Sequence, residues 1–270
     1  MTNPVKTGLA WVRAACELSK SFLRFRLSFT EAENCLASAQ YMLELYNKKV
    51  DKAETSDRSK DFHDACYYEL KASVASLWGE YGNRLLFLSK YNMTNVRPGR
   101  SIPIDKATKS ISMSSTTPIK SLTLEKNLKI IHKYTNQVTD TYVTTRDDAI
   151  SVFLHCIKWF EVTKVCYTKL GFVERIKAVT CDNSKTYKYF AYFEPDLNKQ
   201  IKLLKRQIEM LRDICDIDNF NPTVEDYHNR ALYYDLVVAY AIIVDMIREN
   251  AECYTTCGEE GNLTKIYAIA

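Results

Sequence analysis

Histidine and cysteine, the side chains that most often take part in catalysis or bind metals, are scattered through this sequence. The four histidines are His63, His132, His155 and His228. No two of them have the spacing that places metal ligands on one helix face, and Cys253 and Cys257 lack a second pair of ligands. The sequence contains no Gly-rich phosphate loop and no nucleophile elbow. We therefore expect a non-catalytic protein without a cofactor or a metal; an enzyme site built from dispersed residues is the alternative.

Positive charge is concentrated in one segment, residues 95–121. Five basic residues and one acidic residue give it a formal charge of +4, which equals the net charge of the whole chain. The segment also holds three of the chain's six prolines and nine serines and threonines. It has neither a helical nor a strand period, and such a composition predicts a flexible, exposed linker.

Basic side chains in two regions are candidates for contact with the phosphates of RNA or of an anionic membrane surface. Those in the linker are Arg97, Arg100, Lys106 and Lys109. Those on the first expected helix are Lys6, Arg13, Lys20 and Arg24. The linker also contains candidate modification sites, where phosphate groups would cancel the local charge: Ser101, Ser110, Ser112 and Thr117. The alternative is that the charge serves only solubility.

The run KTYKYFAYF, residues 185–193, combines basic and aromatic residues at the spacing of an RNA-stacking strand. Tyr187, Tyr189 and Tyr192 are its candidate base-stacking residues. The run is rich in strand formers and follows a turn-like DNSK, so we expect a short β-hairpin near residues 175–193. Aromatic packing in a protein core is the alternative interpretation.

A coiled-coil-like seam lies between residues 195 and 215. Its apolar residues alternate at spacings of four and three: Leu197, Ile201, Leu204, Ile208 and Leu211. Such a seam can pair two copies of the chain, and these residues are our candidates for self-association. The same pattern also suits an ordinary bundle helix that packs inside one chain, and its shortness favours that interpretation.

The elements that must position these residues are helices. With 46% apolar residues the chain can bury a sizeable core, and only seven glycines and six prolines leave few turns for a sheet protein. Helical apolar periods predict helices at 5–27, 31–50, 59–91, 146–176, 195–215 and 224–252. Capping boxes, Thr30-x-x-Glu33 and Thr145-x-x-Asp148, open two of them.

Specific faces of these helices are expected to be buried. In the first helix they comprise Trp11, Ala15, Leu18, Phe22 and Phe25, and in the helix at 146–176 they comprise Ile150, Phe153, Leu154, Ile157 and Phe160. Gly79 and Gly82 lie inside the third helix, where each costs about 1 kcal/mol relative to alanine unless close packing compensates. The stretch LVVAYAIIV, residues 236–244, is apolar on every side and predicts a helix surrounded by others.

We therefore expect an all-α protein of six or seven helices. Its predicted parts are a three-helix unit at 1–94, the linker at 95–121 and a helical bundle at 122–270. The absence of a long apolar run and the irregular spacing of nine cysteines predict a reduced protein of the cytoplasm or nucleus that is not secreted and has no transmembrane segment. The expected function is that of a scaffold, adaptor or assembly protein that binds a protein partner or itself. The alternative is an RNA- or membrane-phosphate-binding protein of the viral nucleocapsid or matrix type.

Overall fold

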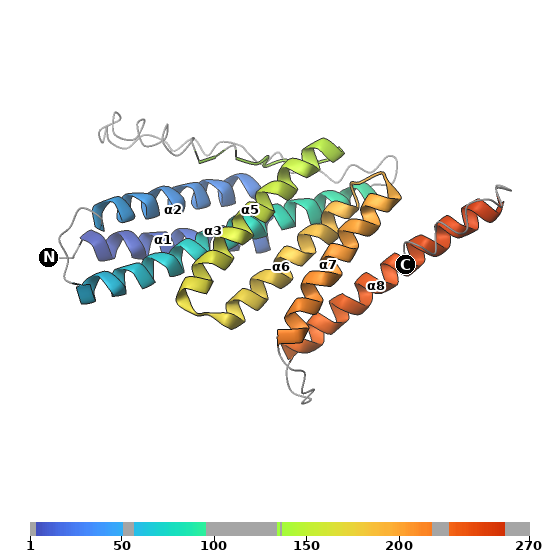
Figure 1. Cartoon of the computed structure of the whole chain (residues 1–270). Coiled ribbons are helices and arrows are strands. Elements are labelled where there is room, and N and C mark those ends of the chain that lie inside the picture. Colours follow the sequence, from blue (N-terminus) through green and yellow to red (C-terminus); the bar gives the residue numbers. More distant parts are fainter. Residues whose placement is uncertain (1–3, 51–56, 96–133, 136, 218–226, 257–270) are drawn as a thin grey trace, which may run out of the picture. The chain divides into compact units, whose positions relative to one another are not determined.

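The structure is a computed structural model that describes residues 4–50, 57–95, 134–135, 137–217 and 227–256 (Figure 1). These residues form seven α-helices, a single π-helical turn and no strand. The elements are α1 (Pro4–Ser21), η1 (Phe22–Arg26), α2 (Phe29–Val50), α3 (Asp57–Asn95), α5 (Arg146–Leu170), α6 (Val173–Ala191), α7 (Leu197–Ile217) and α8 (Tyr227–Thr256). The prediction of an all-α fold is confirmed. No helix in these ranges is long and apolar enough to span a bilayer.

The helices form two compact units, Met1–Val179 (unit 1) and Thr180–Ala270 (unit 2). The predicted linker lies outside the described residues, so its flexibility stays a prediction. The division falls within α6 instead of in that segment, because α5 packs along α3 and so joins the N-terminal helices in one unit.

Two glycines set the approach of α3 to α5 in unit 1. A Cβ atom added at Gly79 would lie 2.5 Å from Cε1 of Phe160, and one added at Gly82 would overlap Sγ of Cys156. Phe160 and Cys156 are both buried, at 1% and 0% exposure. Close packing therefore compensates for the low helix propensity of these glycines, as the sequence predicts.

Gly79→Ala and Gly82→Ala should each destabilise unit 1 by about 1–3 kcal/mol, because the added methyl group overpacks a buried contact. Gly8→Ala is the matched control, since a Cβ atom at this helical glycine meets nothing within 4 Å and should stabilise α1 by up to about 1 kcal/mol. Urea unfolding followed by circular dichroism measures all three. Adding Cys156→Ala should partly restore the stability of the Gly82→Ala variant but not that of the Gly79→Ala variant. Equal stability of all three glycine variants would contradict the close contact between α3 and α5.

The buried face of α1 differs from the prediction. Val12, Ala15, Cys16 and Leu23 are buried, together with Ser19. Of the residues predicted to be inside, Ala15 is buried, but Trp11, Leu18 and Phe25 are exposed, so the prediction is wrong for these three. Small side chains let α1 lie close to α2, where the hydroxyl of Ser19 donates a hydrogen bond to the carbonyl of Ala32 at 3.2 Å.

The beginning of α2 also differs from the predicted capping box. The helix begins at Phe29, and the hydroxyl of Ser28 contacts the carboxylate of Glu31. The hydroxyl of Thr30 instead donates a hydrogen bond to Asp140 Oδ2 at 2.6 Å. The predicted capping box at Thr30 is therefore wrong, and Thr30 instead holds the segment before α5 through Asp140.

The predicted β-hairpin near 175–193 is wrong, because this stretch forms α6. Its buried residues Val179, Asn183, Thr186 and Phe190 recur every three or four residues, which is a helical period. Strand-forming side chains such as Thr and Tyr have only weak, context-dependent preferences, and tertiary packing overrides them here.

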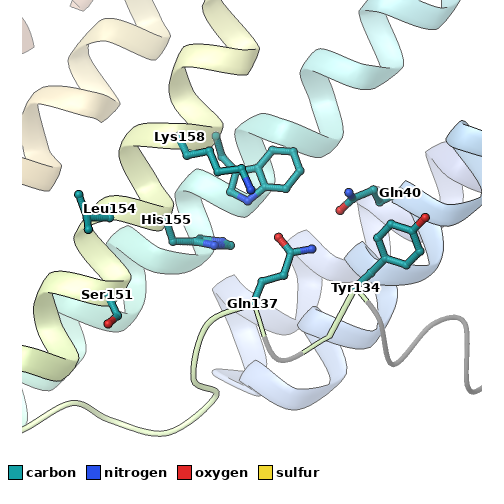
Figure 2. Close-up of a pocket in the computed structure, with 8 residues that line it drawn as sticks. Gln40, Tyr134, Gln137, Ser151, Leu154, His155 and Lys158 are labelled. Carbon is teal, nitrogen blue, oxygen red and sulfur yellow. The ribbon is translucent and has the colours of Figure 1, made fainter.

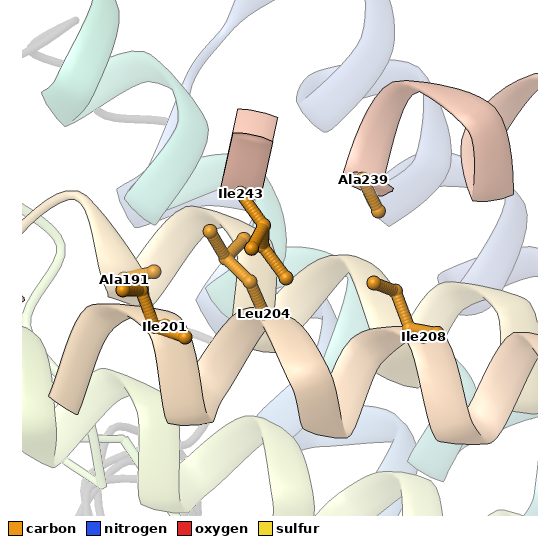
Figure 3. Packing of buried hydrophobic residues seen from close by; sticks show 6 residues of the cluster. All are labelled: Ala191, Ile201, Leu204, Ile208, Ala239 and Ile243. Atoms are coloured by element: carbon orange, nitrogen blue, oxygen red, sulfur yellow. The ribbon is translucent and has the colours of Figure 1, made fainter. Parts of the chain in front are cut away.

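Unit 2 has its core between α7 and α8 (Figure 3). Ile201, Leu204 and Ile208 of α7 pack with Ala239 and Ile243 of α8. The other side of α8 carries exposed apolar residues: Tyr234, Val237, Tyr240 and Val244. The prediction that this helix is surrounded on every side is therefore wrong; α7 covers one face of it, and a second apolar face remains exposed.

Candidate binding pocket

The described residues form an open pocket of about 520 Å³ in unit 1 (Figure 2). One wall comes from α5, one side from α2, and the edge from the non-helical segment before α5. The lining residues are Gln40, Tyr134, Gln137, Ser151, Leu154, His155, Lys158 and Trp159.

The α5 residues reach the pocket because they share one helix face. Positions 151, 154, 155, 158 and 159 follow the three- and four-residue spacing of such a face. The helix begins as predicted, with Thr145 as N-cap: its side chain accepts a hydrogen bond from the amide of Asp148 at 3.2 Å. It ends at Gly171, whose φ of 69° is the left-handed conformation that suits glycine.

The buried face of α5 is displaced from the one predicted. Leu154 is 59% exposed at the pocket, whereas its neighbours His155 and Cys156 are buried. The helix turns its small and polar residues toward α3 because Gly79 and Gly82 bring the two backbones close together. Phe160 is correctly predicted as buried.

Aromatic rings form the inner wall of the pocket. Trp78 of α3 stacks on Trp159 with ring centroids 6.1 Å apart, and meets His155 edge-on at 5.4 Å. The indole N–H of Trp78 donates a hydrogen bond to Gln40 Oε1 at 3.1 Å. These contacts fix the positions of His155 and Trp159, so the wall of the pocket is preorganised.

The electrostatics of the pocket follow from burial. Desolvation, together with the smaller effect of the charge of Lys158, lowers the pKa of His155 from 6.5 to about 4, so the imidazole is neutral at pH 7. Burial and a 2.6 Å hydrogen bond to Glu44 raise the pKa of Tyr134 to about 12. Both groups are uncharged, and Lys158, with Nζ 5.3 Å from the centroid of the Trp159 ring, supplies a positive charge at the rim.

Two buried ring nitrogens, Nε2 of His155 and Nε1 of Trp159, have no hydrogen-bond partner among the described residues. Buried polar atoms are usually hydrogen-bonded, so these two nitrogens call for an explanation. No group of three or more His, Cys, Asp or Glu side chains that could hold a metal ion occurs in the part of the chain that the structure describes.

The predicted basic stripe is partly engaged by acids of the same chain. Lys20 pairs with Glu17 at 2.7 Å and Arg24 pairs with Glu80 at 3.0 Å, while Arg13 is exposed. The side chain of Lys6 and the linker residues Arg97, Arg100, Lys106 and Lys109 lie outside the described residues, as do the candidate modification sites Ser101, Ser110, Ser112 and Thr117. Phosphate contact and modification stay predictions.

The structure does not bring the three candidate stacking tyrosines onto one strand. Tyr187 and Tyr189 are half-buried residues of α6, and Tyr192 follows that helix. Residues two apart in a helix point about 200° from each other, so Tyr187 and Tyr189 lie on different faces. The strand geometry on which the stacking hypothesis depended is therefore absent here.

The predicted seam is positioned by α7, as expected. Ile201, Leu204, Ile208 and Leu211 are buried within unit 2, and Leu197 is half-buried. Their packing with α8 is the single-chain arrangement that the short seam favoured. Self-association through this seam stays a prediction, and it would require these side chains to leave their contacts with α8.

Sequence reasoning missed the pocket, although one signal for it was present. His155 and Trp159 are four residues apart on a predicted helix with Lys158 beside them, so they share one face. Nothing in the sequence indicates that Gln40 or Tyr134 joins them, because these residues are brought close only by the packing of α2 against α3.

These features define an all-α protein with a pocket in unit 1 that is lined in part by aromatic side chains. The chain belongs to the family described as "KIF-1 binding protein C terminal", whose model matches residues 9–266. No solved structure matches the chain.

Curated relatives of the chain carry the name "KIF-binding protein". The one from Drosophila melanogaster is 23% identical over 230 residues, which cover 81% of this chain and 35% of the relative. The one from Gallus gallus is 24% identical over 243 residues (87% and 40%), and the one from Homo sapiens is 23% identical over 252 residues (88% and 39%). The chain thus spans well under half the length of the curated relatives it matches.

Proposed function

We propose that this chain is a non-catalytic, helical binding module whose partner is a KIF protein, that is, a kinesin. The observation that carries the proposal is the family match, which extends over residues 9–266 and includes all the helices from α2 to α8. KIF binding is what the names of the relatives state for those longer proteins. Its transfer to this chain is our proposal.

The structure supports a binding role through surfaces that the fold leaves available. Unit 1 presents an open pocket with a preorganised aromatic wall, and unit 2 presents the exposed apolar face of α8. Aromatic residues in a pocket are common anchors of protein interfaces. We include a cytoplasmic location in the proposal, in accord with the free thiols of Cys16, Cys35, Cys66, Cys156, Cys166, Cys181 and Cys215.

The RNA- or membrane-phosphate-binding alternative gains no support from the comparisons, since none of the relatives named above carries an RNA-binding or viral description. The ion pairs of Lys20 and Arg24 also reduce the charge available to phosphates. Protein binding is therefore the function we favour.

The purified chain should bind a KIF-1 protein with a Kd below about 10 µM, as measured by isothermal titration calorimetry. The alternative ligands, titrated under the same conditions, are a single-stranded RNA and vesicles containing phosphatidylserine. The control is a titration of the same KIF-1 protein with an unrelated helical protein of similar charge. The proposal would be overturned if the chain bound the KIF-1 protein no more tightly than the control protein does. It would also be overturned if the chain bound RNA or vesicles more tightly than the KIF-1 protein.

A further inference from the structure

Two ring nitrogens of the pocket wall have no hydrogen-bond partner among the residues that the structure describes. They are Nε2 of His155, which is 7% exposed, and Nε1 of Trp159, which is 8% exposed. Trp78, which is buried behind Trp159, has an acceptor in Gln40, so one indole of the stacked pair has a partner and the other has none among the described residues. An indole N–H can only donate, and a neutral imidazole can carry its proton on Nε2. With the proton on Nε2, the group that satisfies both nitrogens is a hydrogen-bond acceptor.

The surroundings of these donors indicate what carries the acceptor. Lys158, exposed at the rim, favours a negatively charged group. The acid on the far side, Glu44, already accepts hydrogen bonds from Tyr134 and Gln40. Two donors and one cation suit a carboxylate, whereas phosphate sites usually offer more donors. Exposed Leu154 and the Trp159 ring provide apolar surface for the aliphatic part of an acidic side chain.

Both nitrogens are buried, so an incoming acceptor reaches them only after a neighbouring side chain moves, and Gln137, which also lines the pocket, is our candidate. Figure 2 shows its amide in the pocket, between His155 and Gln40. Gln137 lies on the non-helical segment before α5, and a glutamine side chain can change rotamer without movement of the backbone. A rotated Gln137 would admit an incoming oxygen to the wall.

We propose that this pocket binds an aspartate or glutamate side chain of a protein partner, whose carboxylate accepts hydrogen bonds from Trp159 and His155 and faces Lys158. The inference rests on the proposed function, because it assigns a chemical feature to the protein that this module binds. It makes the pocket the place where an acidic anchor of that partner is held.

Indole signals in a ¹⁵N–¹H spectrum of the full chain provide a direct test. The chain has three tryptophans, Trp11, Trp78 and Trp159, so tryptophan labelling gives three such signals. Titration with an acetylated and amidated pentapeptide that has a central Glu should move the Trp159 signal downfield and leave that of exposed Trp11 unchanged. The same peptide with Gln in place of Glu should bind at least about tenfold more weakly.

Two variants separate the charge from the donor. Lys158→Gln should weaken binding of the Glu peptide by about tenfold, and the matched control, Lys202→Gln on exposed α7 surface, should leave it unchanged. Trp159→Phe keeps an aromatic wall without the donor and should weaken binding by a similar factor. Equal binding of the Glu and Gln peptides would overturn the proposal.

Three further outcomes also contradict an acidic anchor. One is a larger Trp159 shift with inorganic phosphate than with the Glu peptide. The second is no shift with any of these ligands. The third is a Trp159 signal that is already far downfield in the free chain and does not respond, which would show that another part of the chain occupies the pocket.

Failure of this inference can be told apart from failure of the proposed function. If Lys158→Gln and Trp159→Phe bind the KIF-1 protein like the parent, the pocket is not the anchor, although KIF binding stands. If the parent responds to the Glu peptide but does not bind the KIF-1 protein, the pocket assignment stands and the partner is wrong.

Discussion

Ile243→Asp should abolish the cooperative unfolding of unit 2, whereas Val244→Asp should leave its stability nearly unchanged. Ile243 is 7% exposed and packs on Leu204 and its neighbours across the interface of α7 and α8, while Val244, one residue later, is 62% exposed. A carboxylate buried without a partner costs several kcal/mol, which is comparable to the whole stability of a domain.

Urea titrations followed by far-ultraviolet circular dichroism compare the two variants with the parent. The pair is matched in chemistry and differs in the face of α8 that receives the charge. Similar destabilisation by both substitutions would mean that the face with Val237 and Val244 is also buried in solution, for example against another molecule. Similar tolerance would mean that the α7–α8 core is wrongly assigned.

Lowering the pH from 7 to 4 should reduce the free energy of unfolding of unit 1 in the parent protein. The reduction should be about 3 kcal/mol larger than in a His155→Phe variant. Burial lowers the pKa of His155 from 6.5 to about 4. The unfolded chain therefore binds a proton below about pH 6.5 that the folded chain binds only near pH 4. The contribution of His155 is fully present above pH 6.5 and is lost as the pH falls toward 4.

The informative quantity is the difference in pH dependence of stability between the parent and the His155→Phe variant. Carboxylates titrate equally in both proteins, so their contribution drops out of this difference. His155→Phe keeps a ring against Trp78 and removes the titrating group, so its stability should depend less on pH. Lys158→Gln should retain most of the parent's pH dependence, because desolvation is the larger cause of the low pKa. Parallel curves for the parent and His155→Phe would show that His155 titrates normally.

The sequence predicts the helices of this protein well where large apolar residues mark the buried face. In α2 and α3 the large apolar residues that recur at helical spacing are buried, among them Leu36, Leu43, Leu77 and Leu85. In these helices the apolar period and the packing contacts coincide, so the pattern alone indicates which side faces the neighbouring helices.

The same reasoning fails where small residues form the contact. In α1 and α5 the buried faces include Ala15, Cys16, Ala149 and Cys156, which allow close approach of backbones, while Trp11 and Leu154 remain outside. A count of large apolar residues cannot detect this, because the advantage of a small side chain exists only opposite a particular partner. The strand prediction for residues 175–193 fails for a related reason, since local preference does not include the neighbours.

The candidate site was predictable only in part. The sequence places His155 and Trp159 on one face of a helix, but it does not show that both are buried or that Gln40 and Tyr134 complete the pocket. Gln40 and Trp159 are separated by 119 positions in the chain, and no local pattern connects them. Their proximity is a property of the helix packing in unit 1.

The contact between α3 and α5 also limits how this protein can change over evolutionary time. Residues 82 and 156 share one small space, as do residues 79 and 160. A larger residue at 82 is acceptable only after the side chain at 156 has become smaller, so the order of the two substitutions matters. Divergent members of the family are thus expected to change these positions as pairs, and a glycine that looks replaceable by itself is constrained by its partner on the other helix.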